Sequence, residues 1–178
     1  MTTHPIAGYR KLFALVTLPL FVLDQLTKWA VFFTIKPEEG LVPVIPGFFY
    51  LVHWYNTGAA FSVFSDSNWF FIGLSLVALC VIIVMARRNL FADRSSRLGW
   101  ALLFSGILGN VTDRFVHGAV LDFLLFDLHV RFANPWPAFN VADSCICVAA
   151  FLFLWQSFRD GKKAKPEADG AGVPSANR

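Results

Sequence analysis

The chain has 178 residues, of which 56% are hydrophobic and 15% are charged, with a formal net charge of +3. Soluble domains average about 25% charged residues, so this composition is displaced toward that of membrane proteins. It excludes intrinsic disorder, which requires low hydrophobicity and high charge. It also excludes a disulfide-rich secreted module, because the chain holds only three cysteines. We therefore expect one membrane-embedded domain.

Four apolar runs are each close to the roughly 20 residues that a helix needs to cross a bilayer. They cover residues 12–33, 69–86, 98–116 and 140–158. The run at 69–86 holds no charged residue, whereas polar side chains interrupt the other three. The sequence thus predicts an all-α integral membrane protein, a four-helix transmembrane bundle that occupies residues 1–160.

Lysine and arginine are distributed unevenly between the ends of these runs. Eleven of the 15 lie before the first run, between the second and third, or after the fourth, and the outer loops 34–68 and 117–139 hold two. Cytoplasmic segments carry the excess of positive charge, so both termini are expected in the cytoplasm. This asymmetry accounts for the net charge, which therefore indicates no nucleic-acid partner. The tail 161–178 is rich in Lys, Gly and Ala and is predicted to be disordered and cytoplasmic.

Ionisable residues inside membrane spans are costly, so by default they mark functional positions. In the first span, Asp24 and Lys28 stand one helical turn apart and can form an ion pair. In the third span, Asp113 adjoins Arg114. A neighbouring cation keeps a carboxylate ionised, which suits scaffolding or substrate orientation better than acid catalysis. Polar contacts that only hold the bundle together explain both pairs equally well.

Carboxylates from several spans are expected to gather in one layer, just below the outer surface. Two Asn-x-x-Asp motifs approach this layer from consecutive antiparallel helices, one ending at Asp113 and the other at Asp143. Asp122 follows the third span within an apolar stretch. Asp122 and Asp143 have no basic neighbour in sequence, so we interpret them as the chemical candidates. Paired acids in a shielded site can share a proton and activate water.

The surroundings of these two acids are expected to place the shared proton unequally. Asp143 falls in the first turn of a helix, where the dipole favours negative charge. Val, Leu and Phe flank Asp122, and desolvation raises the pKa of a carboxyl group. We therefore expect Asp122 to carry the proton and Asp143 to be the more anionic partner.

The first outer loop contains an aromatic and β-branched run at 48–55, which is typical of a strand. Turn residues bound it on both sides, and the run 59–64 is a candidate for its return partner. An aromatic anchor at the membrane interface is the simpler explanation of this loop, and a lid over the acidic site is the functional one. The four histidines are scattered and no His-Glu-x-x-His motif occurs, so no metal site is expected.

Five motifs stand in order along the chain: Asp24-Gln25-Leu26-Thr27-Lys28, Asn56-Thr57-Gly58-Ala59-Ala60-Phe61, Gly109-Asn110-Val111-Thr112-Asp113-Arg114, Val120-Leu121-Asp122-Phe123 and Phe139-Asn140-Val141-Ala142-Asp143-Ser144. Their order and approximate spacing are similar to those of the lipoprotein signal peptidases (signal peptidase II). The resemblance covers about residues 12–158. One departure is Ser105, which replaces the first of two glycines often found ahead of Gly-Asn.

The resemblance implies an aspartic endopeptidase that removes signal peptides from prolipoproteins, cutting on the amino side of a diacylglyceryl-modified cysteine. It implies no cofactor and no metal, and inhibition by the cyclic peptide globomycin. Asp122 and Asp143 are then the catalytic pair that activates water. By motif position, the residues expected to bind substrate are Asn56, Gly58, Asn110, Arg114 and Asn140, and those expected to support the site are Asp24, Lys28 and Asp113.

The same resemblance implies a place in the cell. The first outer loop corresponds to a small extracytoplasmic β-cradle, and the active site is expected near the periplasmic face of the bacterial inner membrane. The expected partners are diacylglyceryl-modified prolipoproteins and membrane lipid, with no nucleic acid, and the protein is expected to be a monomer.

Two other classes of protein remain open. The first is a small ion or proton transporter that uses Asp24, Asp113 and Asp143 as a relay, and the second is a non-catalytic membrane scaffold. A conduction path needs polar residues through the inner halves of the spans, and that part of the chain is almost wholly apolar, which disfavours transport. A scaffold would tolerate Asp122→Asn and Asp143→Asn, whereas a peptidase would not.

Overall fold

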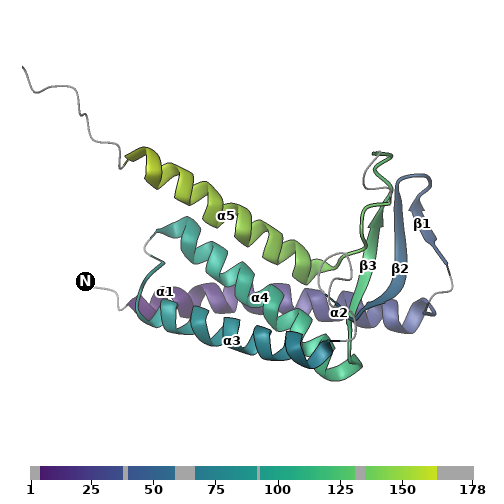
Figure 1. Cartoon of the computed structure of the whole chain (residues 1–178), viewed down its shortest axis with the longest axis horizontal. Helices are drawn as coiled ribbons and strands as arrows, with labels where there is room; N and C mark the ends of the chain where they lie inside the picture. Colours follow the sequence, from purple (N-terminus) through teal and green to yellow (C-terminus); the bar gives the residue numbers. More distant parts are fainter. Residues whose placement is uncertain (1–4, 38–39, 59–66, 92, 131–134, 164–178) are drawn as a thin grey trace, which may run out of the picture.

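The computed structural model describes residues 5–37, 40–58, 67–91, 93–130 and 135–163. The chain is mostly helical, and a small three-stranded sheet stands at one end of the helices (Figure 1). The run 59–64, the candidate return strand of the first outer loop, lies outside the described residues.

The first membrane segment is longer than predicted and is interrupted by a wide turn. It consists of α1 (Pro5–Leu12), a π-helical turn η1 (Phe13–Thr17) and α2 (Leu18–Thr34). Pro19 has no N–H to donate to the carbonyl of Leu15, so the helix is loosened one turn before the proline. The hydroxyl of Thr17 donates to the carbonyl of Ala101 over 2.9 Å, and Ser105 donates to the carbonyl of Thr17 over 3.1 Å. Thr17 and Ser105 therefore tie this turn to α4.

Three further helices follow: α3 (Asn68–Arg87), α4 (Arg94–His117) and α5 (Val141–Lys163). Within the described residues, three helices are long and apolar enough to cross a membrane, namely Gly8–Thr34, Asn68–Arg87 and Val141–Asp160. Three of the four expected spans are thus supported by composition. α4 is not among them, because polar side chains interrupt the half of the helix that ends at His117.

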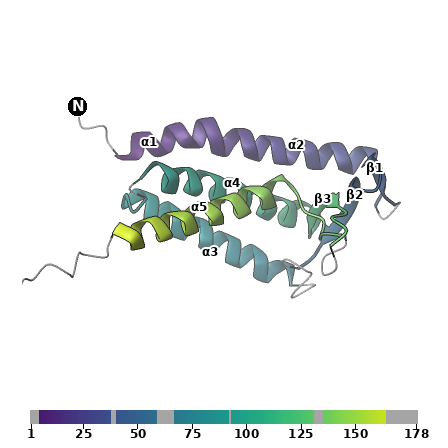
Figure 2. The same cartoon turned by 90° about the horizontal axis from the view of Figure 1, so that it is seen from above.

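α4 packs against α2, α3 and α5 and lies between α2 and α3 when the molecule is seen from above (Figure 2). Two glycines bring its C-terminal half close to α5. A Cβ on Gly106 would collide with the carbonyl of Ala142, and a Cβ on Gly109 would lie 3.0 Å from the Cβ of Ala142. Small residues at such contacts let helix backbones approach closely in membrane proteins. At the other end, Tyr9 and Trp100 belong to a buried apolar cluster that joins α1, α3 and α4.

The sheet is antiparallel in the order β1-β2-β3, with β1 at Val42–Ile45, β2 at Phe49–Asn56 and β3 at Val120–Phe126. β2 lies one residue beyond the strand predicted at 48–55, and its partners come from both outer loops. Gly118 ends α4 with a φ of 76°, in the left-handed region that glycine adopts readily, and β3 begins two residues later. The turn after α4 therefore delivers Asp122 to the sheet.

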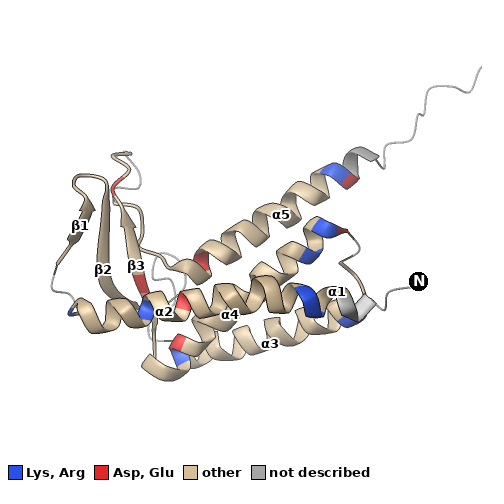
Figure 3. Cartoon of the chain, turned by 180° about the vertical axis from the view of Figure 1, so that it is seen from behind, with Lys and Arg blue, Asp and Glu red and all other residues tan. Residues whose placement is uncertain are grey.

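The Lys and Arg residues are distributed unevenly along the helices, as in the sequence. Most of those that the structure describes lie at the helix ends that face away from the sheet (Figure 3). α5 continues to Lys163, three residues beyond the boundary predicted at residue 160, and the remaining tail 164–178 lies outside the described residues.

Candidate active site

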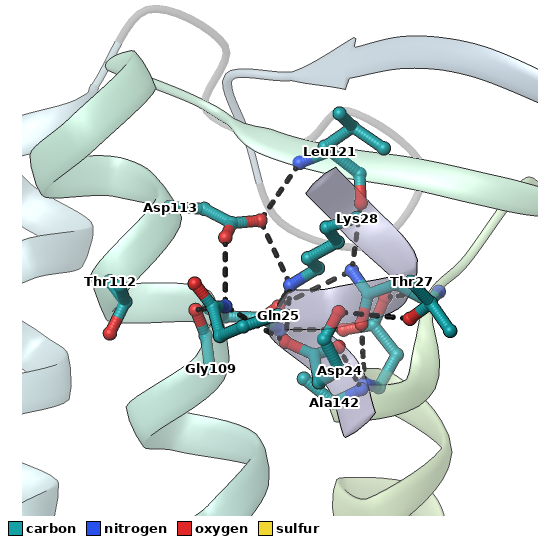
Figure 4. A network of polar contacts seen from close by, with 12 residues as sticks. Asp24, Gln25, Thr27, Lys28, Gly109, Thr112, Asp113, Leu121 and Ala142 are labelled. Carbon is teal, nitrogen blue, oxygen red and sulfur yellow. Dashed lines mark hydrogen bonds and ion pairs between the residues drawn. The ribbon is translucent and has the colours of Figure 1, made fainter. Parts of the chain in front are cut away.

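A buried lysine joins α2 to α4 at the sheet end of the helices. The Nζ atom of Lys28 lies 2.9 Å from Oδ2 of Asp24 and 2.8 Å from Oδ2 of Asp113 (Figure 4). It also donates to Oδ1 of Asn110 over 3.2 Å. The pair expected between Asp24 and Lys28 is thus present. For Asp113, the sequence indicated the adjacent Arg114 as the neighbouring cation. In the structure, the ion pair of Asp113 is with Lys28 from α2.

Asp24 and Asp113, the two carboxylates that contact Lys28, each also accept a backbone N–H, one from α5 and the other from β3. Asp24 Oδ1 accepts the N–H of Ala142 over 2.8 Å, and Asp113 Oδ2 accepts the N–H of Leu121 over 3.1 Å (Figure 4). Ala142 directly precedes Asp143, and Leu121 directly precedes Asp122. The ion-pair cluster therefore fixes the backbone beside both candidate acids.

Asn140 lies between these acids and is fully buried. Its side-chain N–H donates to Oδ1 of Asp122 over 2.8 Å, and its side-chain oxygen accepts the backbone N–H of Asp143 over 2.8 Å. In return, Oδ2 of Asp143 accepts the backbone N–H of Asn140 over 3.3 Å. This reciprocal pair is a capping arrangement at the start of α5. The second Asn-x-x-Asp motif is thus a helix cap, while the first lies inside α4.

Each acid accepts a further side-chain amide. Asn110 donates to Oδ1 of Asp143 over 2.7 Å, and Asn56 donates to Oδ2 of Asp122 over 3.1 Å. Asn140 also donates to Oδ1 of Asn110 over 3.3 Å. The two carboxyl groups therefore sit in one continuous network of amides that joins α4, α5, β2 and β3.

Asp122 lies on β3, outside the membrane-capable helices, and only 4% of its surface is exposed. Burial, with the nearby charge of Asp143, raises the pKa of Asp122 to about 7, while hydrogen bonds from Asn56 and Asn140 and the charge of Lys28 lower it. A carboxyl group in this position keeps a proton at pH values where an exposed aspartate has lost it.

Arg114 joins α4 to the residues just after β2. Its Nη2 donates to the carbonyl of Gly58 over 2.9 Å, and the N–H of Gly58 donates to the side-chain oxygen of Asn56 over 3.0 Å. The guanidinium also lies over the ring of Phe71 in α3, 5.0 Å from its centre. Arg114 thus holds Gly58, and Gly58 orients the side-chain amide of Asn56 that reaches Asp122.

The structure brings all ten predicted site residues into one bonded network. Sequence reasoning did not assign a site role to Gln25, whose side chain donates to Asp24 over 3.1 Å and to Asp113 over 3.2 Å. An amide inside an apolar span was a usable signal for that residue. Phe71 gave no signal, because it is one of many aromatic residues in a span. Among the described residues, no group of His, Cys, Asp and Glu is arranged to hold a metal ion.

Comparison with known proteins agrees with these motifs. A sequence model of the family described as signal peptidase (SPase) II matches residues 16–159. The lipoprotein signal peptidase of Geobacter metallireducens is 38% identical over 156 residues, which cover 86% of this chain and 94% of that protein. That of Azoarcus sp. is 44% identical over 150 residues, which cover 82% of this chain and 81% of that protein.

The fold is also similar to solved structures. A bacterial membrane enzyme determined by the in meso method at 2.3 Å resolution superposes with a TM-score of 0.79 and 26% identity, covering 87% of this chain and 92% of that one. A second such enzyme, determined at 1.9 Å resolution, gives a TM-score of 0.73 and 27% identity, covering 83% of this chain and 93% of that one. The chain therefore belongs to the signal peptidase II family, the lipoprotein signal peptidases.

Proposed function

We propose that this protein is an aspartic endopeptidase that cleaves prolipoproteins on the amino side of their diacylglyceryl-modified cysteine. The observation that carries the proposal is the position of Asp122 and Asp143 on either side of Asn140, which contacts both of them. Two acids in a shielded site, one protonated and one ionised, form the arrangement that activates water in aspartic proteases.

The proposed reaction moves two protons and needs no cofactor. Asp143, in its ionised form, takes a proton from water while the water oxygen bonds to the scissile carbonyl carbon. Asp122 gives its proton to the carbonyl oxygen, which forms a tetrahedral intermediate. Asp143 then passes its proton to the leaving nitrogen as the C–N bond breaks, and Asp122 recovers its proton as the carboxylic acid product forms.

The amides and Arg114 are proposed to hold the substrate backbone. A signal peptide reaches the site as a helix, and its scissile segment must be unwound, which frees backbone groups that are costly in lipid. Asn56 and Asn110 are proposed to offer donors and acceptors for these groups, beside Gly58. Asn140 is fully buried and its amide is bonded to both acids, so it is proposed to act on the substrate through them. The Nε atom of Arg114 is buried and has no hydrogen-bond partner among the described residues, so it is a further donor for a substrate carbonyl.

α4 is proposed to be the fourth transmembrane helix. Its 24 residues span about 36 Å, which exceeds the thickness of the hydrocarbon layer. The polar residues that lower its hydropathy are buried inside the protein, among them Asn110, Asp113 and Arg114. Leu98, Phe115 and Val116, by contrast, are exposed. Lipid would therefore meet an apolar surface.

The orientation follows from the four spans and the distribution of charge. Both termini lie in the cytoplasm, and the sheet and the acid pair lie at the periplasmic face of the bacterial inner membrane. The protein is proposed to act as a monomer in contact with membrane lipid, on diacylglyceryl-modified prolipoproteins.

The test is cleavage of a lipidated prolipoprotein by purified protein in detergent micelles. Asp122→Asn and Asp143→Asn should each lower kcat by at least about 1,000-fold. Matched controls are Asp127→Asn, just after β3, and Asp160→Asn, near the end of α5, and both should cleave at the rate of the unsubstituted protein. Globomycin should inhibit the unsubstituted protein. Cleavage at a normal rate by either site variant would overturn the aspartic mechanism, whereas no cleavage by the unsubstituted protein would favour a scaffold.

A further inference from the structure

His53 is a buried residue that the proposed reaction does not use. It lies on β2 with 1% of its surface exposed, and its Nδ1 atom is 2.6 Å from the carbonyl oxygen of Ile35, the residue that follows α2. A carbonyl oxygen only accepts, so Nδ1 carries the proton and donates. The Nε2 atom has no hydrogen-bond partner among the described residues. The imidazole thus fastens the middle of β2 to the end of α2.

This fastening falls at an irregularity in the sheet. Leu51 pairs with Leu124 and Trp54 pairs with Asp122, so three steps along β2 correspond to two steps along β3. The extra residue lies at Val52 and His53, both of which are buried. Such a β-bulge re-aims the side chains that follow it and is frequent beside active sites.

The bulge decides which face of the sheet Asn56 occupies. Beyond it, Asn56 pairs with Val120, two residues from the pair of Trp54 and Asp122, so Asn56 and Asp122 are diagonal neighbours on one face. The side chain of Asn56 donates to Asp122 there over 3.1 Å. In a regular ladder, His53 would stand opposite Asp122 and Asn56 would point to the other face.

We infer that His53 is a positioning residue for peptide cleavage, whose hydrogen bond to Ile35 locks the bulge of β2 and thereby keeps Asn56 on Asp122. The inference rests on the proposed catalytic role of Asp122. The hydrogen bond of His53 also ties β2 to the helix that holds the other side of the site, because α2 carries Lys28 and Asp24. The other explanation is packing alone, since the ring lies 5.8 Å from that of Phe32 and 5.1 Å from that of Tyr55.

Two variants separate the hydrogen bond from the packing. His53→Phe keeps an aromatic ring and loses the donor. His53→Asn loses the ring but keeps an N–H close to the position of Nδ1. The two are compared with the unsubstituted protein for kcat, KM and the dependence of kcat/KM on pH, and for thermal unfolding in the same micelles.

We expect kcat to fall about 10-fold or more in His53→Phe with little change in KM, because small misplacements of reacting groups are costly. The alkaline midpoint of kcat/KM should also rise, since the hydrogen bond from Asn56 lowers the pKa of Asp122. The other charged groups facing Asp122 are Lys28 of α2, Arg114 of α4 and Asp143 of α5, and neither variant changes them. His53→Asn should keep the kcat and the midpoint of the unsubstituted protein.

The inference is overturned if His53→Phe keeps its kcat and midpoint, or if His53→Asn is impaired as much as His53→Phe. If His53→Phe does not fold, His53→Asn decides alone. An unchanged alkaline midpoint of kcat/KM in that variant supports the role of the hydrogen bond to Ile35, and a raised midpoint contradicts it. If neither folds, NMR of the unsubstituted protein decides, because a bonded Nδ1 proton exchanges slowly with water and an unbonded one does not. These outcomes are independent of Asp122→Asn, whose retained activity would overturn the proposed mechanism itself.

Discussion

The side-chain amide of Asn140 donates to Oδ1 of Asp122 over 2.8 Å. The oxygen of that amide accepts the backbone N–H of Asp143 over 2.8 Å, so both ends of the group are committed. Because an amide cannot exchange its donor and acceptor ends without breaking both bonds, Asp122 always meets a donor at this oxygen. One buried side chain thus caps α5 and orients the acid on β3.

These two tasks can be separated by substitution. Asn140→Ser keeps a good helix cap but lacks the amide that reaches Asp122, so we expect impaired cleavage with a small loss of stability. Asn140→Ala loses the cap as well and should be less stable than the serine variant by about 0.5–2 kcal/mol. Cleavage rates and thermal unfolding of the two variants check this. Normal cleavage by Asn140→Ser would show that the amide is needed only as a cap.

The pH dependence of cleavage should report Asp122. Its pKa is raised from an ordinary value of about 3.9 to about 7, so the protonated form that the mechanism requires persists until pH rises through 7. We therefore expect kcat/KM to fall on the alkaline side with a midpoint near 7. Asn56→Ala removes a hydrogen bond that lowers this pKa, so its midpoint should lie at higher pH than that of the unsubstituted protein. A midpoint that moves to lower pH in Asn56→Ala would contradict this assignment.

The sequence predicted which polar residues lie together better than it predicted the elements that carry them. Polar side chains in membrane spans are costly, and spacing on a helix fixes which of them share a face, so Asp24, Lys28 and Asn110 could be placed in one layer from the sequence. The partner of Asp113 could not be deduced in the same way. Consecutive helical residues point in different directions, so the adjacent Arg114 reaches Gly58 while Lys28 reaches Asp113 from α2.

The strands show where the sequence signal ends. β2 shows the aromatic and β-branched residues typical of a strand. The first four residues of β3 are all buried and, apart from Asp122, apolar, so they show no alternation of apolar and polar positions. Such a run is indistinguishable by periodicity from a buried helical segment. The bulge at Val52 and His53 was likewise invisible, because it exists only in the pairing of two distant segments.

Lys28 should be the residue on which the stability of the site depends most. It is 3% exposed and forms ion pairs with both Asp24 and Asp113. Lys28→Met leaves two buried carboxylates without their cation, and breaking a buried pair in this way costs about 3–5 kcal/mol. Lys11→Met, at an exposed position of α1, should stay within about 0.5 kcal/mol of the unsubstituted protein.

A triple variant checks the cause of that loss. When Lys28→Met is combined with Asp24→Asn and Asp113→Asn, no uncompensated charge remains, and part of the lost free energy of unfolding should return. Unfolding followed by tryptophan fluorescence in micelles measures all these variants. If Lys28→Met loses no more stability than Lys11→Met, the ion pairs do not hold the site together.

Close packing of α4 is the last feature that a matched pair of substitutions can test. A Cβ at Gly109 would lie 2.6 Å from Oδ2 of Asp24, which Lys28 and the N–H of Ala142 hold in place, so the carboxylate cannot move aside. Gly109→Ala should therefore destabilise the protein by about 1–3 kcal/mol and impair cleavage. A Cβ added at Gly73 in α3 would meet no neighbouring group within 4 Å, so Gly73→Ala should gain about 0.5–1 kcal/mol from helix propensity and leave cleavage unchanged. Thermal unfolding and cleavage assays on the two variants measure the contrast, and equal effects at both positions would show that the approach of α4 to α2 tolerates a methyl group.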